Sequence, residues 1–80
     1  MKAKIYISYK NGILDPQGET VSHALDAIGI NNINSVRIGK YIEMDFDNIS
    51  KKDVEILVDK SCKKLLVNPN TQTYTYEIKE

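Results

Sequence analysis

The longest regular pattern in this chain is the stretch Val36-Arg37-Ile38-Gly39-Lys40-Tyr41-Ile42-Glu43-Met44-Asp45-Phe46-Asp47. Every second side chain, from Val36 to Phe46, falls on one face, which is apolar except at Lys40. The other face is largely polar and includes three acidic residues. A period of two predicts a half-buried β-strand. No two-residue hairpin signal interrupts it, so one long strand, bent near Gly39, is favoured over two strands, because glycine commonly marks a bulge or a close backbone approach.

The residues before this stretch predict a strand and a helix. Residues 3–9 alternate apolar and polar side chains, as a half-buried strand does, and Asn11-Gly12 ends them in a turn. A helix is expected to begin at Asp15-Pro16, because aspartate caps free N–H groups and proline is well tolerated in the first turn. It is expected to end at Gly29. Its apolar stripe is Val21, Ala24, Leu25 and Ile28.

The residues after the stretch predict a second helix and a last strand. Ser50-Lys51-Lys52-Asp53 resembles a capping box, with aspartate in place of the usual glutamate. Asn68-Pro69-Asn70 ends this helix in a loop, and residues 73–78 alternate as a strand. The residues expected on the inner face of the helix are Val54, Leu57, Val58, Ser61, Cys62 and Leu65.

The order β-α-β(β)-α-β predicts an α+β fold in a single domain, residues 1–80. The expected architecture is a two-layer sandwich, in which a small antiparallel sheet carries both helices on one face. Tyr6, Tyr41 and either Tyr74 or Tyr76 are candidates for the other face, which would suit association. The long strand would outrun its own sheet and leave an edge that invites pairing with another chain. Dimer pairing is therefore expected to extend the sheet.

Composition excludes several classes of protein. Eleven lysines and arginines balance 11 aspartates and glutamates, so the basic surplus of a nucleic-acid-binding module is missing. The start of the chain has no signal-peptide pattern, and no segment approaches the roughly 20 apolar residues of a membrane span. We therefore expect a soluble cytosolic domain. The single cysteine rules out an internal disulfide, so oligomerisation is the expected support for so small a core.

No set of residues in the sequence indicates catalysis, cofactor binding or metal binding. His23, the only histidine, lies one step off the first helix's apolar stripe, so a surface position is favoured over an acid–base role. Cys62 falls on an inner helix face, where packing is a more common role than nucleophilic attack. The acids Glu43, Asp45 and Asp47 share a strand face that is expected to be solvated. A weak cation site is the alternative there.

Two short segments carry more polar and glycine residues than packing requires. In Leu14-Asp15-Pro16-Gln17-Gly18, the glycine weakens a helix by roughly 1 kcal/mol relative to alanine, which close approach of a backbone or ligand would explain. In Val36-Arg37-Ile38-Gly39-Lys40-Tyr41, Arg37 suits either a cross-strand ion pair or a partner. Lys40 suits either a snorkelling position or a carboxylate or phosphate on a partner.

These segments, taken in order with others, resemble the PurS family, the small subunit of formylglycinamidine ribonucleotide (FGAM) synthase. The resemblance covers nearly the whole chain, with departures mainly at residues 31–35 and 70–73. The segments that carry it are the lysine-rich first strand, Leu14-Asp15-Pro16-Gln17-Gly18, Val36-Arg37-Ile38-Gly39-Lys40-Tyr41, Cys62-Lys63-Lys64-Leu65-Leu66, Asn68-Pro69, and the strand from Tyr74 to Ile78.

The resemblance implies a subunit without an active site of its own. In such systems a large synthetase subunit uses ATP and Mg to convert formylglycinamide ribonucleotide to formylglycinamidine ribonucleotide, and a glutaminase subunit releases ammonia. The small subunit, a homodimer that could pair further into a tetramer, bridges the two in the cytoplasm and supports ammonia transfer without a cofactor of its own. The residues expected to contact partners are Asp15, Pro16, Gln17, Gly18, Arg37, Gly39, Lys40 and Tyr41.

Two other interpretations compete with this one. A small-molecule-binding regulatory module of βα type would show a ligand-dependent shift of the melting temperature. An RNA-binding domain with the RRM order of elements would need aromatic residues on central strands beside a basic surplus, which the charge balance opposes.

Overall fold

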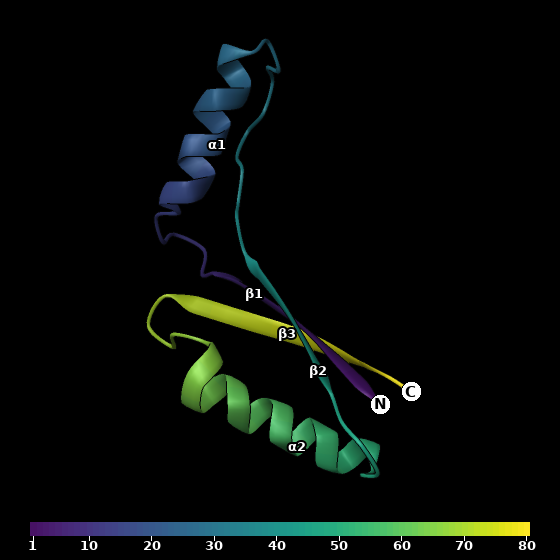
Figure 1. Ribbon diagram of the computed structural model, residues 1–80. Coiled ribbons are helices and arrows are strands. Elements are labelled where there is room, and N and C mark those ends of the chain that lie inside the picture. The colour runs from purple at the N-terminus through teal and green to yellow at the C-terminus, as the bar shows by residue number, and fades with distance from the viewer.

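Three antiparallel strands form one sheet with β1 at its centre, in the order β2-β1-β3 (Figure 1). The structure is a computed structural model that describes residues 1–80. Neither of its α-helices is long and apolar enough to cross a membrane. Its elements are β1 (Lys2–Tyr9), α1 (Pro16–Ala27), β2 (Lys40–Asp45), α2 (Lys51–Ser61), the π-helical turn η1 (Cys62–Leu66) and β3 (Gln72–Lys79). The predicted α+β class and element order are confirmed.

The core lies between the sheet and α2. The predicted alternation in β1 directs Ala3, Ile5 and Ile7 towards this helix, and all three are buried. Ile5 sits at the centre, opposite Ile42 on β2 and Tyr76 on β3. The core residues supplied from the other side are Val54, Val58, Cys62 and Val67. Each buried isoleucine or valine contributes about 1.5–3 kcal/mol, but only eight of the 80 residues are buried, so the core of one chain is small.

Cys62 is fully buried in this core, as predicted. Burial raises the pKa of its thiol, and the nearby Asp59 carboxylate raises it further. Because the thiolate is the reactive form, we expect a thiol reagent to modify native Cys62 at least about tenfold more slowly than the unfolded chain. Modification followed at neutral pH, with and without denaturant, measures this ratio. Equal rates would contradict the burial of Cys62 beneath α2.

The first helix does not lie on the sheet. Instead α1 and residues 30–39 run side by side away from it, and we call these two segments the arm (Figure 1). The radius of gyration is 16.1 Å, against about 12 Å for a compact chain of this length. Of the two helices predicted to share one sheet face, only α2 does so within a single chain. Because no hairpin precedes β2, residues 30–39 continue straight past the sheet, and α1 remains beside them.

The predicted long strand is only partly a strand. Residues 36–47 are expected as one bent strand, but β2 covers Lys40–Asp45 alone. β2 begins where its pairing with β1 begins, at the pair Ile7–Lys40, although β1 itself continues to Tyr9 beside β3. Of the bulge and the close backbone approach considered at Gly39, the structure shows the close approach. A Cβ atom there would collide with the carbonyl oxygen of Ile7.

The tyrosines divide between the two faces of the sheet. Tyr6 and Tyr41 lie on the face away from α2, as predicted, with their ring centroids 5.2 Å apart. The placement of Tyr74 or Tyr76 on that face is wrong, because their position in β3 directs both towards α2. There the hydroxyl of Tyr74 donates to Asp59 at 2.9 Å. Burial and this carboxylate raise the pKa of Tyr74 to about 12.

The end of α2 also differs from the prediction. Leu65, expected on the inner face, is 83% exposed. Here the chain forms a π-helical turn, in which the N–H of Val67 donates to the carbonyl of Cys62, five residues earlier. The wider turn carries Leu65 outward and brings Val67 into the core. Leu57, also predicted to face inward, is 41% exposed.

Candidate functional site

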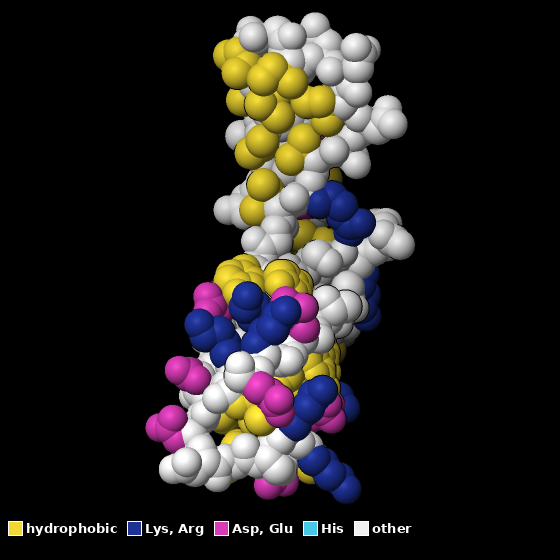
Figure 2. Space-filling view, turned by 90° about the vertical axis from the view of Figure 1, so that its right-hand side faces the viewer, with side chains coloured by type: hydrophobic (Ala, Val, Ile, Leu, Met, Phe, Trp, Pro, Cys, Tyr) yellow, Lys and Arg dark blue, Asp and Glu magenta, His cyan; other side chains and the backbone are white.

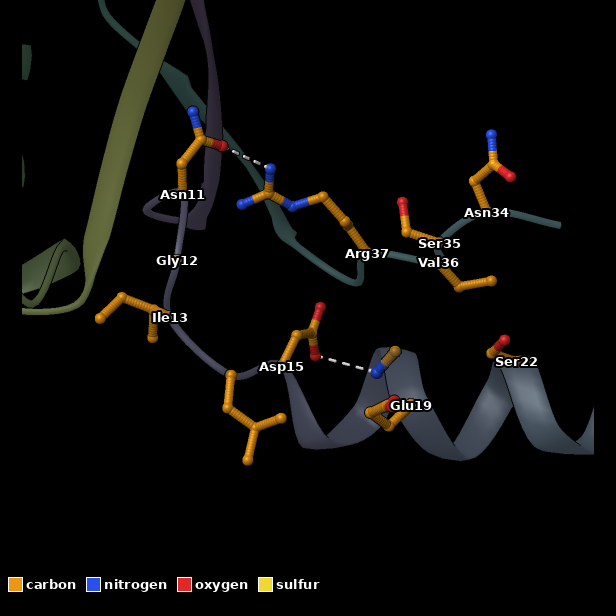
Figure 3. A pocket seen from close by; sticks show the side chains of 12 residues that line it. Asn11, Gly12, Ile13, Asp15, Glu19, Ser22, Asn34, Ser35, Val36 and Arg37 are labelled. Atoms are coloured by element: carbon orange, nitrogen blue, oxygen red, sulfur yellow. Dashed lines mark hydrogen bonds between the residues drawn. The ribbon is translucent and has the colours of Figure 1, made fainter.

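The two segments singled out in the sequence meet at the base of the arm (Figure 3). One begins α1, and the other is the extended segment that leads into β2. They touch at Gly18, where a Cβ atom would collide with the carbonyl oxygen of Val36. Of the two explanations considered for Gly18, a backbone or a ligand close by, the structure shows a backbone, and it is that of the chain itself.

Asp15 links these segments through both oxygens of its carboxylate. One oxygen caps α1 by accepting from the Gly18 N–H at 2.9 Å, and the other accepts from the Ile38 N–H at 2.7 Å. These two bonds, led by that of Gly18, hold the pKa of Asp15 below its ordinary value of 3.8. A lowered pKa means that the carboxylate stabilises the folded state above this ordinary value. The contribution is lost as the pH falls through the lowered pKa.

Arg37 ties the arm to the end of β1. Its guanidinium donates to the side-chain oxygen of Asn11 at 2.9 Å, and also to the backbone carbonyl of Tyr9. The cross-strand ion pair considered for Arg37 is absent, because the extended segment leaves the sheet before Arg37 can face a strand carboxylate. The planar fork of arginine matches this pair of acceptors, since it presents several N–H groups in fixed directions.

Open grooves flank the first turn of α1. The first has a volume of about 410 Å³ and is lined by Asn11, Gly12, Ile13, Leu14, Asp15, Gly18, Glu19, Ser22, Asn34, Ser35, Val36 and Arg37 (Figure 3). The second, of about 480 Å³, is lined by Pro16, Gln17, Thr20, Val21 and Ile38. Neither groove contains His23, whose exposed side chain forms no hydrogen bond. No three His, Cys, Asp or Glu side chains gather closely enough to hold a metal ion.

The eight residues expected to contact partners fall into two groups. Asp15, Gly18, Arg37 and Gly39 make contacts within the chain. Pro16, Gln17, Lys40 and Tyr41 are exposed. The side chain of Lys40 forms no hydrogen bond or ion pair, although it shares a strand face with Ile42 and Met44. The second group is therefore available to another molecule.

An exposed apolar surface on the arm was not foreseen from the sequence. Figure 2 shows hydrophobic side chains gathered over the upper part of the molecule, which the arm forms. The exposed large apolar side chains of this part of the chain include Ile28 (72%) and Ile30, and Leu14 (71%) lies just before α1. The helical spacing did indicate an apolar stripe on α1, but periodicity cannot tell whether a stripe packs on its own sheet or on that of another chain.

The extended half of the arm also has unpaired backbone. Between Asn31 and Arg37, no backbone N–H or C=O forms a hydrogen bond. This segment continues directly into β2, an edge strand whose outer side has no neighbour. An extended, unpaired edge of this kind is a template for a strand from another chain.

Comparison with known proteins places this architecture in a family. The model of the family described as "PurS: Phosphoribosylformylglycinamidine (FGAM) synthase" matches residues 2–80. The chain belongs to the PurS family. The PurS subunit of phosphoribosylformylglycinamidine synthase from Bacillus subtilis is 44% identical over 79 residues, covering 99% of this chain and 93% of that protein. The PurS subunit from Methanocaldococcus jannaschii is 38% identical and covers 98% and 92%.

Solved PurS structures share the fold. The structure of B. subtilis PurS matches with a TM-score of 0.87 at 44% identity and covers 99% of this chain and 98% of that one. A chain of the structure described as PurLQS from Thermotoga maritima matches with a TM-score of 0.85 at 30% identity and covers 95% and 93%. The resemblance to PurS drawn from the sequence is thus confirmed.

Proposed function

We propose that this chain is the non-catalytic subunit that bridges the synthetase and glutaminase subunits of FGAM synthase in the cytoplasm. Membership of the PurS family makes it a subunit of that enzyme in purine biosynthesis. The observation that carries the proposal is the arm, because it presents exposed apolar side chains and backbone groups without a partner in the chain, both of which suit burial against another chain. In this proposal ATP and Mg belong to the large subunit, and this chain binds no cofactor.

A second copy of this chain fits the arm. The accessible surface is 5965 Å², about 1,100 Å² more than expected for a compact 9.1 kDa monomer. The excess is comparable to the roughly 800 Å² that each partner buries in a standard interface. A homodimer would account for it, and two such dimers would make the tetramer.

The arm and the body of the molecule, which consists of the sheet and α2, offer surfaces that can pair with each other in two copies. The extended segment of one copy would pair with the free edge of β2 in the other. The apolar stripe of α1 would then lie beside α2 of the other copy, where Ile42 and Met44 are only half-buried and Leu57 is exposed. Each sheet of the dimer would carry two helices on one face, one from each chain.

We assign contacts with the larger subunits to Pro16, Gln17, Lys40 and Tyr41. They are exposed around the base of the arm, where Asp15, Gly18, Arg37 and Gly39 hold the backbone in place. Lys40 is suited to a carboxylate or phosphate on a partner because it is a cation without an internal partner.

Reconstitution tests the bridging role. The synthetase and glutaminase subunits are assayed with and without this chain, with either glutamine or free ammonia as the nitrogen donor. We expect glutamine-driven turnover to require the chain and ammonia-driven turnover to proceed without it, because ammonia added to the solution needs no bridge. If the chain changes neither rate, the bridging role is wrong.

A further inference from the structure

We propose that Asp15 and Arg37 form a joint that fixes the direction of the arm, and that this direction sets how tightly two copies pair. The proposal gives these residues a positioning role in place of the direct partner contact expected from the sequence. It rests on the proposed homodimer, and it concerns how the orientation of the arm within one chain affects association with a second chain.

The arm needs a joint because little else holds it. α1 does not pack on the sheet, and the arm joins the body of the chain at only two places, through residues 10–15 before α1 and at Gly39, where residues 30–39 enter β2 (Figure 1). Two such connections, one of them containing Gly39, would allow the arm to swing. Side-chain bonds must therefore supply the rigidity that packing supplies elsewhere in the fold.

The bonds of Asp15 and Arg37 cross both connections. Asp15 holds the start of α1 to the extended segment through the N–H groups of Gly18 and Ile38, so the two halves of the arm move together. Arg37 then holds this unit to the end of β1 through Tyr9 and Asn11. All four bonds involve a charged group, and such bonds are roughly twice as strong as neutral ones.

A fixed direction matters for closure of a dimer. In the proposed dimer, the arm of each copy lies on the body of the other copy. Both of these contacts must form at the same time for the dimer to close. Rigid, correctly aimed arms gain from the high effective concentration of the second contact. Arms that swing must be ordered on binding, which weakens association, and each arm can instead reach a different chain and form open assemblies.

Two variants, each with a matched control, distinguish loss of the joint from a general loss of folding stability. Asp15→Asn keeps a good helix cap, but its single side-chain oxygen replaces two carboxylate acceptors, one for each segment. Its control is Ser50→Ala, which removes the cap of α2, where the Ser50 hydroxyl accepts from the Asp53 N–H at 3.2 Å and no second segment is joined. Arg37→Gln is matched by Lys52→Gln, which removes an exposed cation that has no hydrogen bond or ion pair.

Sedimentation and X-ray scattering, measured well below the melting temperature, test the joint. We expect the joint variants to raise the dimer dissociation constant by about tenfold or more and to form species larger than dimers. Their controls should match the wild type, and slow modification of Cys62 should confirm an intact core in every variant. If Asp15→Asn and Arg37→Gln leave both the dimer dissociation constant and the X-ray scattering unchanged, the proposed joint is wrong.

If the wild-type protein is a monomer in solution, the proposed dimer is wrong, and so is the proposed effect of the joint on dimer formation. Scattering by the monomers would still decide whether the joint directs the arm. A radius of gyration that changes in the joint variants alone would support this role, and equal values in all variants would reject it.

Discussion

Replacing Ile28 with aspartate should convert the dimer into monomers. Ile28 is 72% exposed at the end of α1 and belongs to the apolar stripe that we place against a second chain. Burying this side chain contributes about 1.5–3 kcal/mol to each side of the interface, and a buried, unpaired carboxylate costs more. Because the exchange is symmetrical, each substitution acts twice, and we expect the dissociation constant to rise at least about 100-fold.

The measurement is the mass in solution across a range of concentrations. Ile56→Asp is the matched control, because Ile56 is 55% exposed and lies on the side of α2 away from the core. It introduces the same charge without entering the proposed interface. A variant at Ile28 that remains as dimeric as this control would show that the stripe of α1 faces something else.

Replacing Gly18 with alanine should destabilise the arm, although helix propensity predicts the opposite. Within a helix, alanine is favoured over glycine by about 1 kcal/mol. At Gly18, however, the added Cβ would collide with the Val36 carbonyl, and neither backbone can move without breaking the bonds of Asp15. Overpacking of this kind costs about 1–3 kcal/mol, so the sign of the change distinguishes the two effects.

Hydrogen exchange measures this loss locally. In Gly18→Ala, we expect the amides of α1 and Ile38 to exchange at least about tenfold faster, while those of α2 stay protected because α2 packs on the sheet. Glu19→Ala, at the next and exposed helix position, should change little. Slower exchange in Gly18→Ala would mean that the close approach of the two segments is wrong.

The sequence predicted the elements of this fold better than their arrangement. Alternation located β1 and β3, and the caps at Asp15 and Ser50 correctly began both helices. These features depend on neighbouring residues. The position of α1 depends on whether the chain turns back near Gly39. Residues 36–47 keep one phase throughout, so they gave no sign that the sheet would end halfway along them.

The same limit applies to the site. Gly18 and Gly39 were expected to permit close backbone approach, and the structure shows it at both. The partners of Arg37 could not be predicted, because Tyr9 and Asn11 become its neighbours only once the arm has left the sheet. The outward position of Leu65 depends on one wider turn of helix, and no residue type marks such a turn.

The unpaired arm has a consequence for the abundance of this protein in a cell. If much of the folding free energy arises only when two chains meet, stability follows mass action and rises with concentration. Newly made chains that find no second copy then spend more time unfolded, and unfolded chains are the preferred targets of proteases. Surplus or solitary copies would be cleared, and the protein would persist in proportion to its assembled form. The small core thus links the lifetime of the chain to its assembly.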